Sequence, residues 1–375
     1  MKKILIIAYY YSPFQGVGAK RATYWGRNIE RIADDIQCTV ITATKQNANE
    51  SEEEIIYVEP TTKESILTNL IKDEGLKWLP SLKEYFLNSR NENKYDVVVI
   101  TGGPFLHFSI ANLLKKIYNC KIILDFRDPF SSNPRYKNNK VIESVKKYLE
   151  FNYVRKSDVV LTVNKYCEKL IYGNRIFTSK FKVIDNGYDE SIVNRIKESN
   201  QISTNGANPL KIVYAGTFYN DVNPDVFINV IRQSNFSNSI EFVHVGKKSN
   251  CVIGDNVKQL GVRSYEETLK IINSSDICLI FTGGEEFEST TKIFDYLAFQ
   301  KTILIITAGE KKSGNINQIL NGIPNVYWAY NVESDINSVL NRILEENNND
   351  NKEYSTYKFS RSCGLHDLIE VIRSL

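Results

Sequence analysis

Short apolar runs alternate with longer amphipathic segments along most of this chain. Runs such as 4–10, 121–124 and 277–281 contain few or no charged residues, which is typical of strands buried on both faces of a parallel sheet. Segments such as 19–33 and 140–156 predict the helices between them. The predicted strands cover 4–10, 38–42, 55–58, 95–100, 121–124, 159–163, 181–184, 211–215, 240–245, 257–260, 277–281, 302–306 and 325–328. This alternation predicts an α/β fold with parallel sheets.

The chain is predicted to form two doubly wound α/β domains in series. With 375 residues it is too long for one typical core. The polar segment 194–209, which ends in Asn-Pro, is the clearest linker, and strand–helix alternation restarts after it. We therefore expect domains at 1–195 and 205–355, followed by a C-terminal segment at 356–375 that contains a last helix. An apolar stretch at 62–91 predicts a helical excursion within the first domain.

Charge and cysteine content narrow the functional classes. Residues 1–190 carry 29 Lys and Arg against 23 Asp and Glu, and much of the excess lies between Lys115 and Lys156. A basic face on one domain fits an anionic membrane surface or a polyanionic ligand, although a solvated surface explains it equally well.

Six cysteines are scattered without a CxxC pair, which predicts a reducing compartment and no metal site. The N-terminal apolar run is too short for a secretory signal, so we expect a cytoplasmic protein.

The strongest candidate site follows the run 277–281. A Gly-Gly turn and an acidic loop lead to Ser289, Thr290 and Thr291, which open a predicted helix. A strand, a loop and a helix start form an anion site, because free N–H groups and the helix dipole point at the ligand. Lys292 adds a positive charge, and Asp295 could accept hydrogen bonds from sugar hydroxyls. An ordinary helix capped by Ser289 or Thr290 is the alternative.

Two further loops lie at predicted strand ends in the first domain. The glycine-rich loop 12–18 precedes a helix with Lys20 in its first turn, but it lacks the G-x-G-x-x-G pattern of dinucleotide sites. The segment 125–129 ends a strand with Asp-Phe-Arg-Asp-Pro, at the position where open α/β sheets bind ligands. An Asp–Arg pair bracing the loop is an equal alternative. His107 is a candidate base or a packed histidine beside a helix start.

Taken together, these motifs resemble a known family. Their order along nearly the whole chain is similar to that of GT-B glycosyltransferases, in particular the retaining GT4-type branch of bacterial surface-polysaccharide pathways. The matching pieces are 9–13 with 16–18, Thr-Gly-Gly-Pro-Phe at 101–105, 125–128, Asp-Asn-Gly-Tyr-Asp at 185–189, 214–218 and 291–298. The resemblance implies two Rossmann-like domains facing a cleft, with the C-terminal helix crossing back to the N-terminal domain.

The resemblance also implies roles for individual residues. The C-terminal domain would bind a nucleotide-sugar donor, with Asp295 on the ribose and Ser289, Thr290, Thr291 and Lys292 on the diphosphate. The loop 261–265, including Val262, Arg263 and Tyr265, would line the base pocket. Gly16 and Gly18 would approach the phosphates and donor sugar. The N-terminal domain would bind the acceptor, for which the candidates are Lys20, His107 and Arg127.

The chain departs from the family pattern at three positions. Phe287 stands where many relatives have the glutamate that contacts the donor sugar, and Glu285, Glu286 or Glu288 could replace it. Thr217 stands where many relatives have a cation, which leaves Lys292 to meet the diphosphate charge. Asp replaces the more usual Glu at 295.

The chemistry expected from the resemblance is transfer of a sugar from a UDP- or GDP-linked donor to a lipid-linked or polysaccharide acceptor. Lys292, Asp128 and Glu288 are the catalytic candidates, and no cofactor or metal is expected, because helix-start amides and one lysine can stabilise the leaving diphosphate. We expect peripheral association with the inner face of an anionic membrane and no nucleic-acid binding. A GT-B-fold sugar-nucleotide epimerase and a non-catalytic scaffold are the alternatives.

Overall fold

A computed structural model of the chain contains two compact units. Unit 1 comprises Met1–Asp185 and Cys363–Leu375, and unit 2 comprises Asn186–Ser362. The structure describes residues 1–46, 54–62, 71–90, 93–134, 139–174, 176–199, 209–218, 224–233, 236–250, 254–346 and 353–375. Part of the predicted excursion at 62–91 and most of the predicted linker at 194–209 lie outside these ranges.

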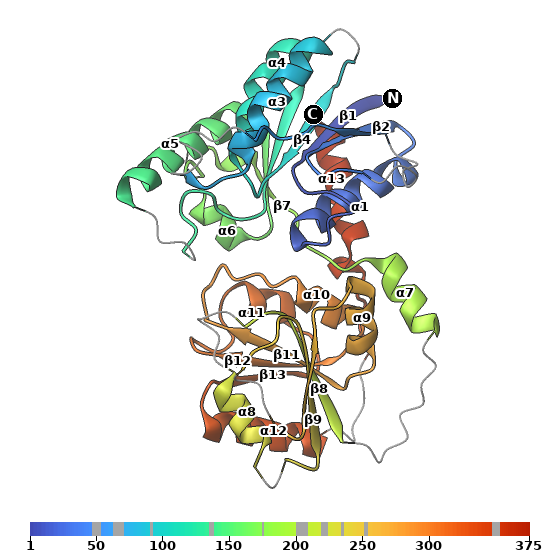
Figure 1. Ribbon diagram of the computed structural model, residues 1–375, viewed down its shortest axis with the longest axis vertical. Helices are drawn as coiled ribbons and strands as arrows, with labels where there is room; N and C mark the ends of the chain where they lie inside the picture. The colour runs from blue at the N-terminus through green and yellow to red at the C-terminus, as the bar shows by residue number, and fades with distance from the viewer. Residues whose placement is uncertain are drawn as a thin grey trace. The chain divides into compact units, whose positions relative to one another are not determined.

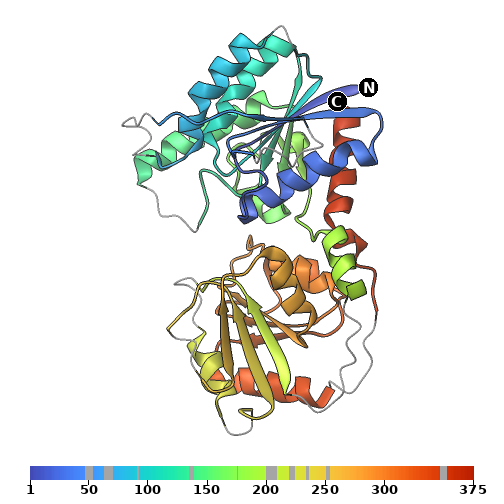
Figure 2. The same ribbon diagram turned by 45° about the vertical axis from the view of Figure 1, so that its right-hand side comes forward.

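Unit 1 is built on a seven-stranded parallel sheet in the order β3-β2-β1-β4-β5-β6-β7. Its strands are β1 (Lys2–Ala8), β2 (Ile36–Thr42), β3 (Glu54–Tyr57), β4 (Val97–Thr101), β5 (Lys121–Phe126), β6 (Val159–Thr162) and β7 (Phe181–Val183). Its helices are α1 (Val17–Ile32), α3 (Gly75–Asn88), α4 (Ala111–Tyr118), α5 (Lys140–Lys156) and α6 (Lys165–Leu170), with short 3-10 turns η1 (Leu106–Ile110) and η2 (Thr178–Lys180). Helices cover both faces of the sheet (Figures 1 and 2). The central strands are therefore fully buried, as their apolar runs predict.

Unit 2 repeats this plan on a six-stranded parallel sheet in the order β10-β9-β8-β11-β12-β13. Its strands are β8 (Leu210–Ala215), β9 (Ile240–Val245), β10 (Val257–Gly261), β11 (Ile277–Thr282), β12 (Thr302–Thr307) and β13 (Val326–Tyr330). Its helices are α7 (Glu190–Ser199), α8 (Asp225–Ile231), α9 (Tyr265–Asn273), α10 (Lys292–Ala298), α11 (Gly314–Leu320) and α12 (Glu333–Glu346), with a 3-10 turn η3 (Tyr357–Phe359). Both units are thus doubly wound α/β structures, which confirms the predicted fold class.

The last helix, α13 (Arg361–Ser374), returns the chain to unit 1. Leu365, Leu368 and Ile372 are fully buried in the same apolar cluster as the strand residues Ile4 and Ile6. Lys2 Nζ donates to the carbonyl of Ile372 (2.9 Å) in the same region. Figures 1 and 2 show α13, in red, beside the blue β1 and α1, although these segments lie at opposite ends of the chain.

The division between the units differs from the expected one. It falls after Asp185, and α7 belongs to unit 2 because Val193 and Ile196 pack into that unit's core. Helices α7 and α8 were not predicted; in α7 the buried residues are a minority within a polar segment.

The described cysteines are free thiols, and four of these five are buried. Among the described residues, no helix has both the length and the apolar character needed to span a bilayer.

Candidate functional site

Each sheet has one point at which the strand order reverses. In unit 1 the reversal lies between β1 and β4, and in unit 2 it lies between β8 and β11. Ligands of open α/β sheets bind outside the carboxyl ends of the strands at such a point, because the two flanking loops diverge there and leave a crevice. The described residues directly after β8 are 216–218, and the loop after β11 is 283–291, which leads into α10.

Lys292 lies at the reversal point of unit 2. Its Nζ is 4.0 Å from the centre of the Tyr214 ring, which belongs to the last part of β8. A Cβ added at Gly216 would lie only 2.5 Å from Nζ, so a larger residue there would displace the ammonium from its present position. Helix α10 therefore directs Lys292 across the end of the sheet, where the loop after β8 begins.

The surroundings of Lys292 disfavour its charge. The side chain keeps some solvent exposure, but protein atoms surround its ammonium closely, and this desolvation lowers its pKa from 10.5 to about 7. Among the described residues, no carboxylate forms an ion pair with Nζ. The ammonium instead lies over the face of the Tyr214 ring, in a cation–π contact. A cation held without a counter-ion at a strand end is well placed to bind an anion.

Tyr265 and Asp295 form a second part of this site. The Tyr265 hydroxyl donates to Oδ1 of Asp295 (2.6 Å), and the carboxylate is almost completely buried. Burial, followed by the negative charge of Asp295, raises the pKa of Tyr265 well above 10. The tyrosine therefore stays protonated and fixes the orientation of the carboxylate, which has acceptor sites for more than one hydrogen bond.

The acidic loop before α10 is anchored by two residues. Phe287 is buried, so the residue in the position of the family's sugar-contacting glutamate holds the loop on the core. Glu288 folds back to the end of β11, where the Thr282 hydroxyl donates to its Oε2. Glu285 and Glu286 are exposed. Glu288 is thus the acidic side chain that the structure brings to the strand end.

The remaining predicted donor residues lie around these groups. Ser289, Thr290 and Thr291 are partly buried and precede α10, with Thr291 as the N-cap residue. The cap position therefore falls on Thr291 and not on Ser289 or Thr290, as the alternative expected, and the Thr291 side chain makes no capping hydrogen bond in this described segment. The Thr217 carbonyl accepts from the Tyr214 hydroxyl (3.1 Å). Val262 and Arg263 are exposed after β10.

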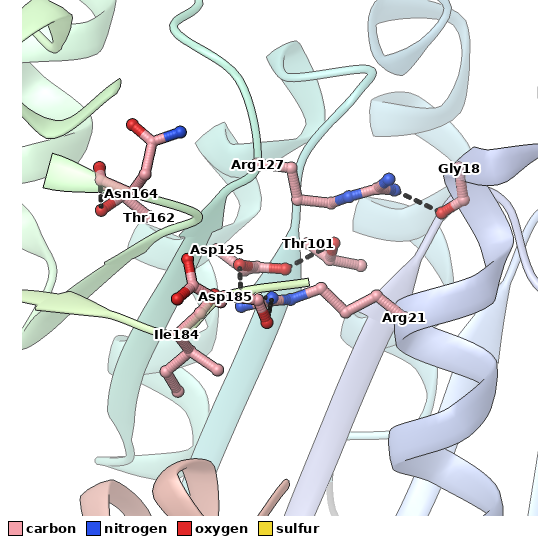
Figure 3. A network of polar contacts seen from close by, with 9 residues as sticks. All are labelled: Gly18, Arg21, Thr101, Asp125, Arg127, Thr162, Asn164, Ile184 and Asp185. Carbon is pink, nitrogen blue, oxygen red and sulfur yellow. Dashed lines mark hydrogen bonds and ion pairs between the residues drawn. The ribbon is translucent and has the colours of Figure 1, made fainter. Parts of the chain in front are cut away.

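In unit 1 a buried arginine organises the carboxyl ends of several strands (Figure 3). Arg21, on α1, donates through Nη2 to Asp125 at the end of β5 (3.2 Å), and both side chains are buried. The Thr101 hydroxyl donates to the second carboxylate oxygen (3.1 Å). Nη1 of Arg21 donates to the carbonyls of Ile184 (2.8 Å) and Asp185 (3.0 Å), the last residues before the chain leaves the unit.

An Asp–Arg pair that braces the loop was one of two equal alternatives for the segment 125–129, and the observed partner of Asp125 is Arg21 rather than an arginine of that segment. Arg127 instead donates to the carbonyls of Gly18 (2.5 Å) and Val17 (3.2 Å) and holds the start of α1. Arg21 occupies the apolar stripe of α1, with its guanidinium 4.4 Å from the Trp25 ring. A lone arginine within an otherwise apolar helix face was the signal that could have identified it.

The glycines of the 12–18 loop make room for aromatic rings. A Cβ on Gly16 would lie 2.2 Å from the Phe14 ring, and one on Gly18 would lie 3.1 Å from Tyr10. The Tyr10 and Phe14 rings stack with centres 4.5 Å apart, and Phe14 is exposed. Of the other candidates in this unit, Asp128 is exposed and Lys20 is partly buried on α1.

His107 does not fit the predicted role at an acceptor. Its ring is fully buried beside Trp78 (5.2 Å between ring centres), and its Nε2 lies 3.2 Å from the Thr101 carbonyl. Burial lowers the pKa of His107 from 6.5 to about 3, so the ring is neutral at physiological pH. A side chain without exposed surface does not contact an acceptor, and His107 is better described as a packed histidine.

Asp185 is a functional candidate that sequence reasoning did not single out. The residue retains solvent exposure, but protein atoms around its carboxylate raise its pKa to about 6 by desolvation, although Arg21 lowers it. It follows β7 at the same edge as Asp125.

Among the described residues, no group of three His, Cys, Asp or Glu side chains could hold a metal ion.

Structural comparison identifies proteins with the same fold. Sucrose-phosphate synthase from Thermosynechococcus elongatus has a TM-score of 0.70 at 11% identity, and the match covers 100% of this chain and 99% of that one. Anabaena Alr3699/HepE in complex with UDP has a TM-score of 0.69 at 12% identity, with complete coverage of both chains. A proposed UDP-N-acetylglucosamine 2-epimerase from Listeria monocytogenes has a TM-score of 0.62 at 10% identity, covering 100% and 96%. No protein-family model and no curated protein sequence matches the chain. The matches show that the chain has the GT-B fold.

Proposed function

We propose that this protein is a glycosyltransferase that moves a sugar from a nucleoside-diphosphate donor to a hydroxyl acceptor. The observation that carries the proposal is Lys292, a cation without a carboxylate partner among the described residues, held at the strand-order reversal of unit 2. Tyr265 and Asp295 lie on the same edge and fit a ribose. Proteins of this fold include a sucrose-phosphate synthase and one that was solved with UDP, which supports the proposal.

The proposed reaction proceeds with retention at the sugar. The bond between C1 and the diphosphate oxygen breaks, and the acceptor oxygen forms its bond to C1 from the same face. The hydroxyl proton goes to the departing phosphate oxygen. Lys292 stabilises the charge that develops on the diphosphate. Glu288, at the end of β11, is the proposed contact of the donor sugar, because Phe287 carries no polar group.

We propose that the acceptor is a lipid-linked or polysaccharide glycan and that unit 1 binds it. The stacked rings of Tyr10 and Phe14 offer an apolar platform that fits the face of a sugar ring, at the carboxyl end of β1. Arg127 and Asp128 follow β5 on the same edge of the sheet. We further propose peripheral association with the inner face of an anionic membrane, for which the basic helix α5 provides the charge.

A screen of UDP, GDP, ADP and dTDP by thermal shift tests the proposal, since a ligand that binds only the folded state raises its stability. We expect one diphosphate to raise the melting temperature and the corresponding nucleoside to have no effect. Release of that diphosphate from the nucleotide-sugar then tests catalysis. If no diphosphate binds, the protein is better explained as a scaffold. If UDP-sugars are epimerised without an acceptor, the epimerase alternative replaces transfer.

Removal of the Asp295 carboxylate is expected to weaken diphosphate binding by about tenfold or more, because hydrogen bonds to a charged group contribute roughly 1.5–3 kcal/mol each. Asp295→Ala should also lose discrimination between UDP and its 2′-deoxy form. Tyr265→Phe, which removes only the orienting hydroxyl, should cost about fivefold. Titration calorimetry gives these constants, with the exposed Glu266→Ala on the same helix as control. Unchanged binding in Asp295→Ala contradicts the ribose assignment.

Donor affinity is expected to fall as the pH rises above 7. The pKa of Lys292 is about 7 in the free protein, and a bound diphosphate raises it, so binding at higher pH requires uptake of a proton. The affinity should be flat below pH 6 and decrease by at most about tenfold per pH unit above 7. The intact nucleotide-sugar is the ligand to use, because its diphosphate diester lacks the phosphate ionisation near pH 6 of a monoester. Lys292→Met should remove this pH dependence of the affinity. If the affinity of the variant still falls above pH 7, another group causes the dependence.

A further inference from the structure

Helix α5 is attached to unit 1 through one face. Its Glu150 carboxylate is buried and accepts from the backbone N–H groups of Phe130 (3.0 Å) and Ser131 (2.9 Å). On the same side, the Tyr153 hydroxyl lies 2.9 Å from Oγ of Ser109, and Val154 has no exposed surface. These contacts fix the helix rigidly on the unit, and Figures 1 and 2 show it at the unit's outer side.

The opposite face of α5 carries apolar side chains in solvent. Val141 and Tyr148 are each 68% exposed, and Val145 is 43% exposed. Their spacing of four and three residues places them in one stripe along the helix. The core of unit 1 does not use this stripe, so its apolar character is not explained by folding.

Two exposed apolar residues follow α6, in a segment that contacts α5. Tyr172 is 50% exposed and Ile176 is 68% exposed. The backbone N–H of Tyr172 donates to Oε1 of Glu150 (2.5 Å), and its ring lies 6.1 Å from that of Phe151, one turn from Tyr148. The segment is therefore held beside the helix. Five of the fourteen large apolar residues that are exposed in the described parts of the chain belong to α5 or to the segment after α6.

The charge around these residues is strongly positive. Residues 139–182 contain ten Lys and Arg against four Asp and Glu. Of the acids, Glu150 is buried and bonded to backbone, and Glu143 pairs with Lys147 (2.6 Å). Exposed cations remain at both ends of the stripe, with Lys140 at the start of α5 and Arg155 and Lys156 at its end.

We propose that the α5 docking face, formed by Val141, Val145 and Tyr148, lies on an anionic phospholipid surface. Apolar side chains on a helix with flanking lysines are the features that hold a helix in the plane of a bilayer interface. Tyrosine favours this depth because its ring is apolar and its hydroxyl stays hydrated. The flanking cations meet the lipid phosphates. This inference rests on the proposed membrane association and names the surface that makes it.

Vesicle sedimentation tests the α5 docking face. The wild-type chain is expected to bind vesicles of phosphatidylcholine and phosphatidylglycerol in equal parts, and not phosphatidylcholine alone. The double variant Val145→Glu and Tyr148→Glu should lose at least about tenfold in vesicle affinity. It removes apolar contact with the bilayer and adds repulsion between the new carboxylates and the anionic lipids. A double variant of Leu87→Glu and Val332→Glu is the matched control, since it makes the same change at two exposed apolar residues elsewhere. It should bind as the wild type does.

Quenching by brominated lipids locates the contact directly. The native residues Trp25, Trp78 and Trp328 are buried, so an indole introduced by Tyr148→Trp supplies the exposed signal. We expect strong quenching in that variant and little in Leu87→Trp. Equal quenching in the two variants overturns the proposal.

The outcomes separate the surface from the function. If the wild type and the double variant Val145→Glu and Tyr148→Glu bind vesicles equally well, the α5 docking face is rejected, but membrane association is retained. No vesicle binding by the wild type rejects both, while diphosphate binding in the thermal-shift screen still tests the transferase. If gel filtration without lipid shows a dimer that the double variant dissociates, the face contacts a second copy and the lipid proposal is wrong.

Discussion

Lys292→Met is expected to lower sugar transfer and donor hydrolysis by roughly a hundred- to a thousand-fold, the usual effect of removing one preorganised electrostatic group. The ammonium sits over the Tyr214 ring at the strand-order reversal of unit 2, where the diphosphate charge would develop. Methionine keeps the length and the apolar part of the side chain. The loss should therefore appear in the rate, with the fold of the unit unchanged.

The same substitution is expected to stabilise the protein. The pKa of Lys292 is about 10.5 when unfolded and about 7 when folded, so below pH 7 the folded state holds a charge that its surroundings disfavour. After allowance for its partial exposure, Met should raise the free energy of unfolding by roughly 1–3 kcal/mol at pH 7. This gain should shrink as the pH rises above 7 and vanish only above 10.5, where the lysine is neutral in both states.

Guanidinium unfolding at pH 6.5 and pH 9.5, together with a donor-hydrolysis assay, checks both effects. Lys258→Met is the matched control, since Lys258 is exposed and forms a surface pair with Glu241. It should change neither the rate nor the free energy of unfolding by a measurable amount. If Lys292→Met lowers the free energy of unfolding at pH 7, the buried ammonium does not destabilise the folded protein, and this explanation of the site is wrong.

The strands of both sheets could be predicted because parallel strands buried on two faces are continuous apolar runs. The run 277–281 and the observed β11 agree within one residue. The helix after it was predicted from its Ser/Thr opening, but it starts at Lys292 without a side-chain cap among the described residues around it. Local chemistry therefore located the element but not its first residue.

Side-chain partners could not be predicted in the same way. Arg21 and Asp125 are 104 residues apart and meet because α1 packs against the strand ends, which no local pattern contains. For His107 the sequence left a candidate base and a packed histidine open, and helix α3 decides for packing by placing Trp78 against the ring. Helix α7 was missed because only Val193 and Ile196 of its ten residues are buried. In each case tertiary burial decided the outcome.

Arg21→Met is expected to destabilise the protein by about 3–5 kcal/mol, because it leaves the Asp125 carboxylate buried without its cation. The change also removes the donors that hold the carbonyls of Ile184 and Asp185, where the chain leaves unit 1. Denaturant unfolding gives the free energy. The surface pair of Arg195 with Glu266 supplies the comparison, and Arg195→Met should cost less than about 1 kcal/mol.

Combining Arg21→Met with Asp125→Asn separates the two contributions. The amide removes the buried charge and can still accept from the Thr101 hydroxyl, so the double variant should recover about half of the loss. The unrecovered part then measures the carbonyl contacts of the chain exit. Arg21 also lowers the pKa of Asp185, so in Arg21→Met that pKa should rise above its value of about 6, which carboxylate NMR can follow. If Arg21→Met costs no more than Arg195→Met, the buried pair does not stabilise the strand ends, and Arg21 is free to serve a ligand.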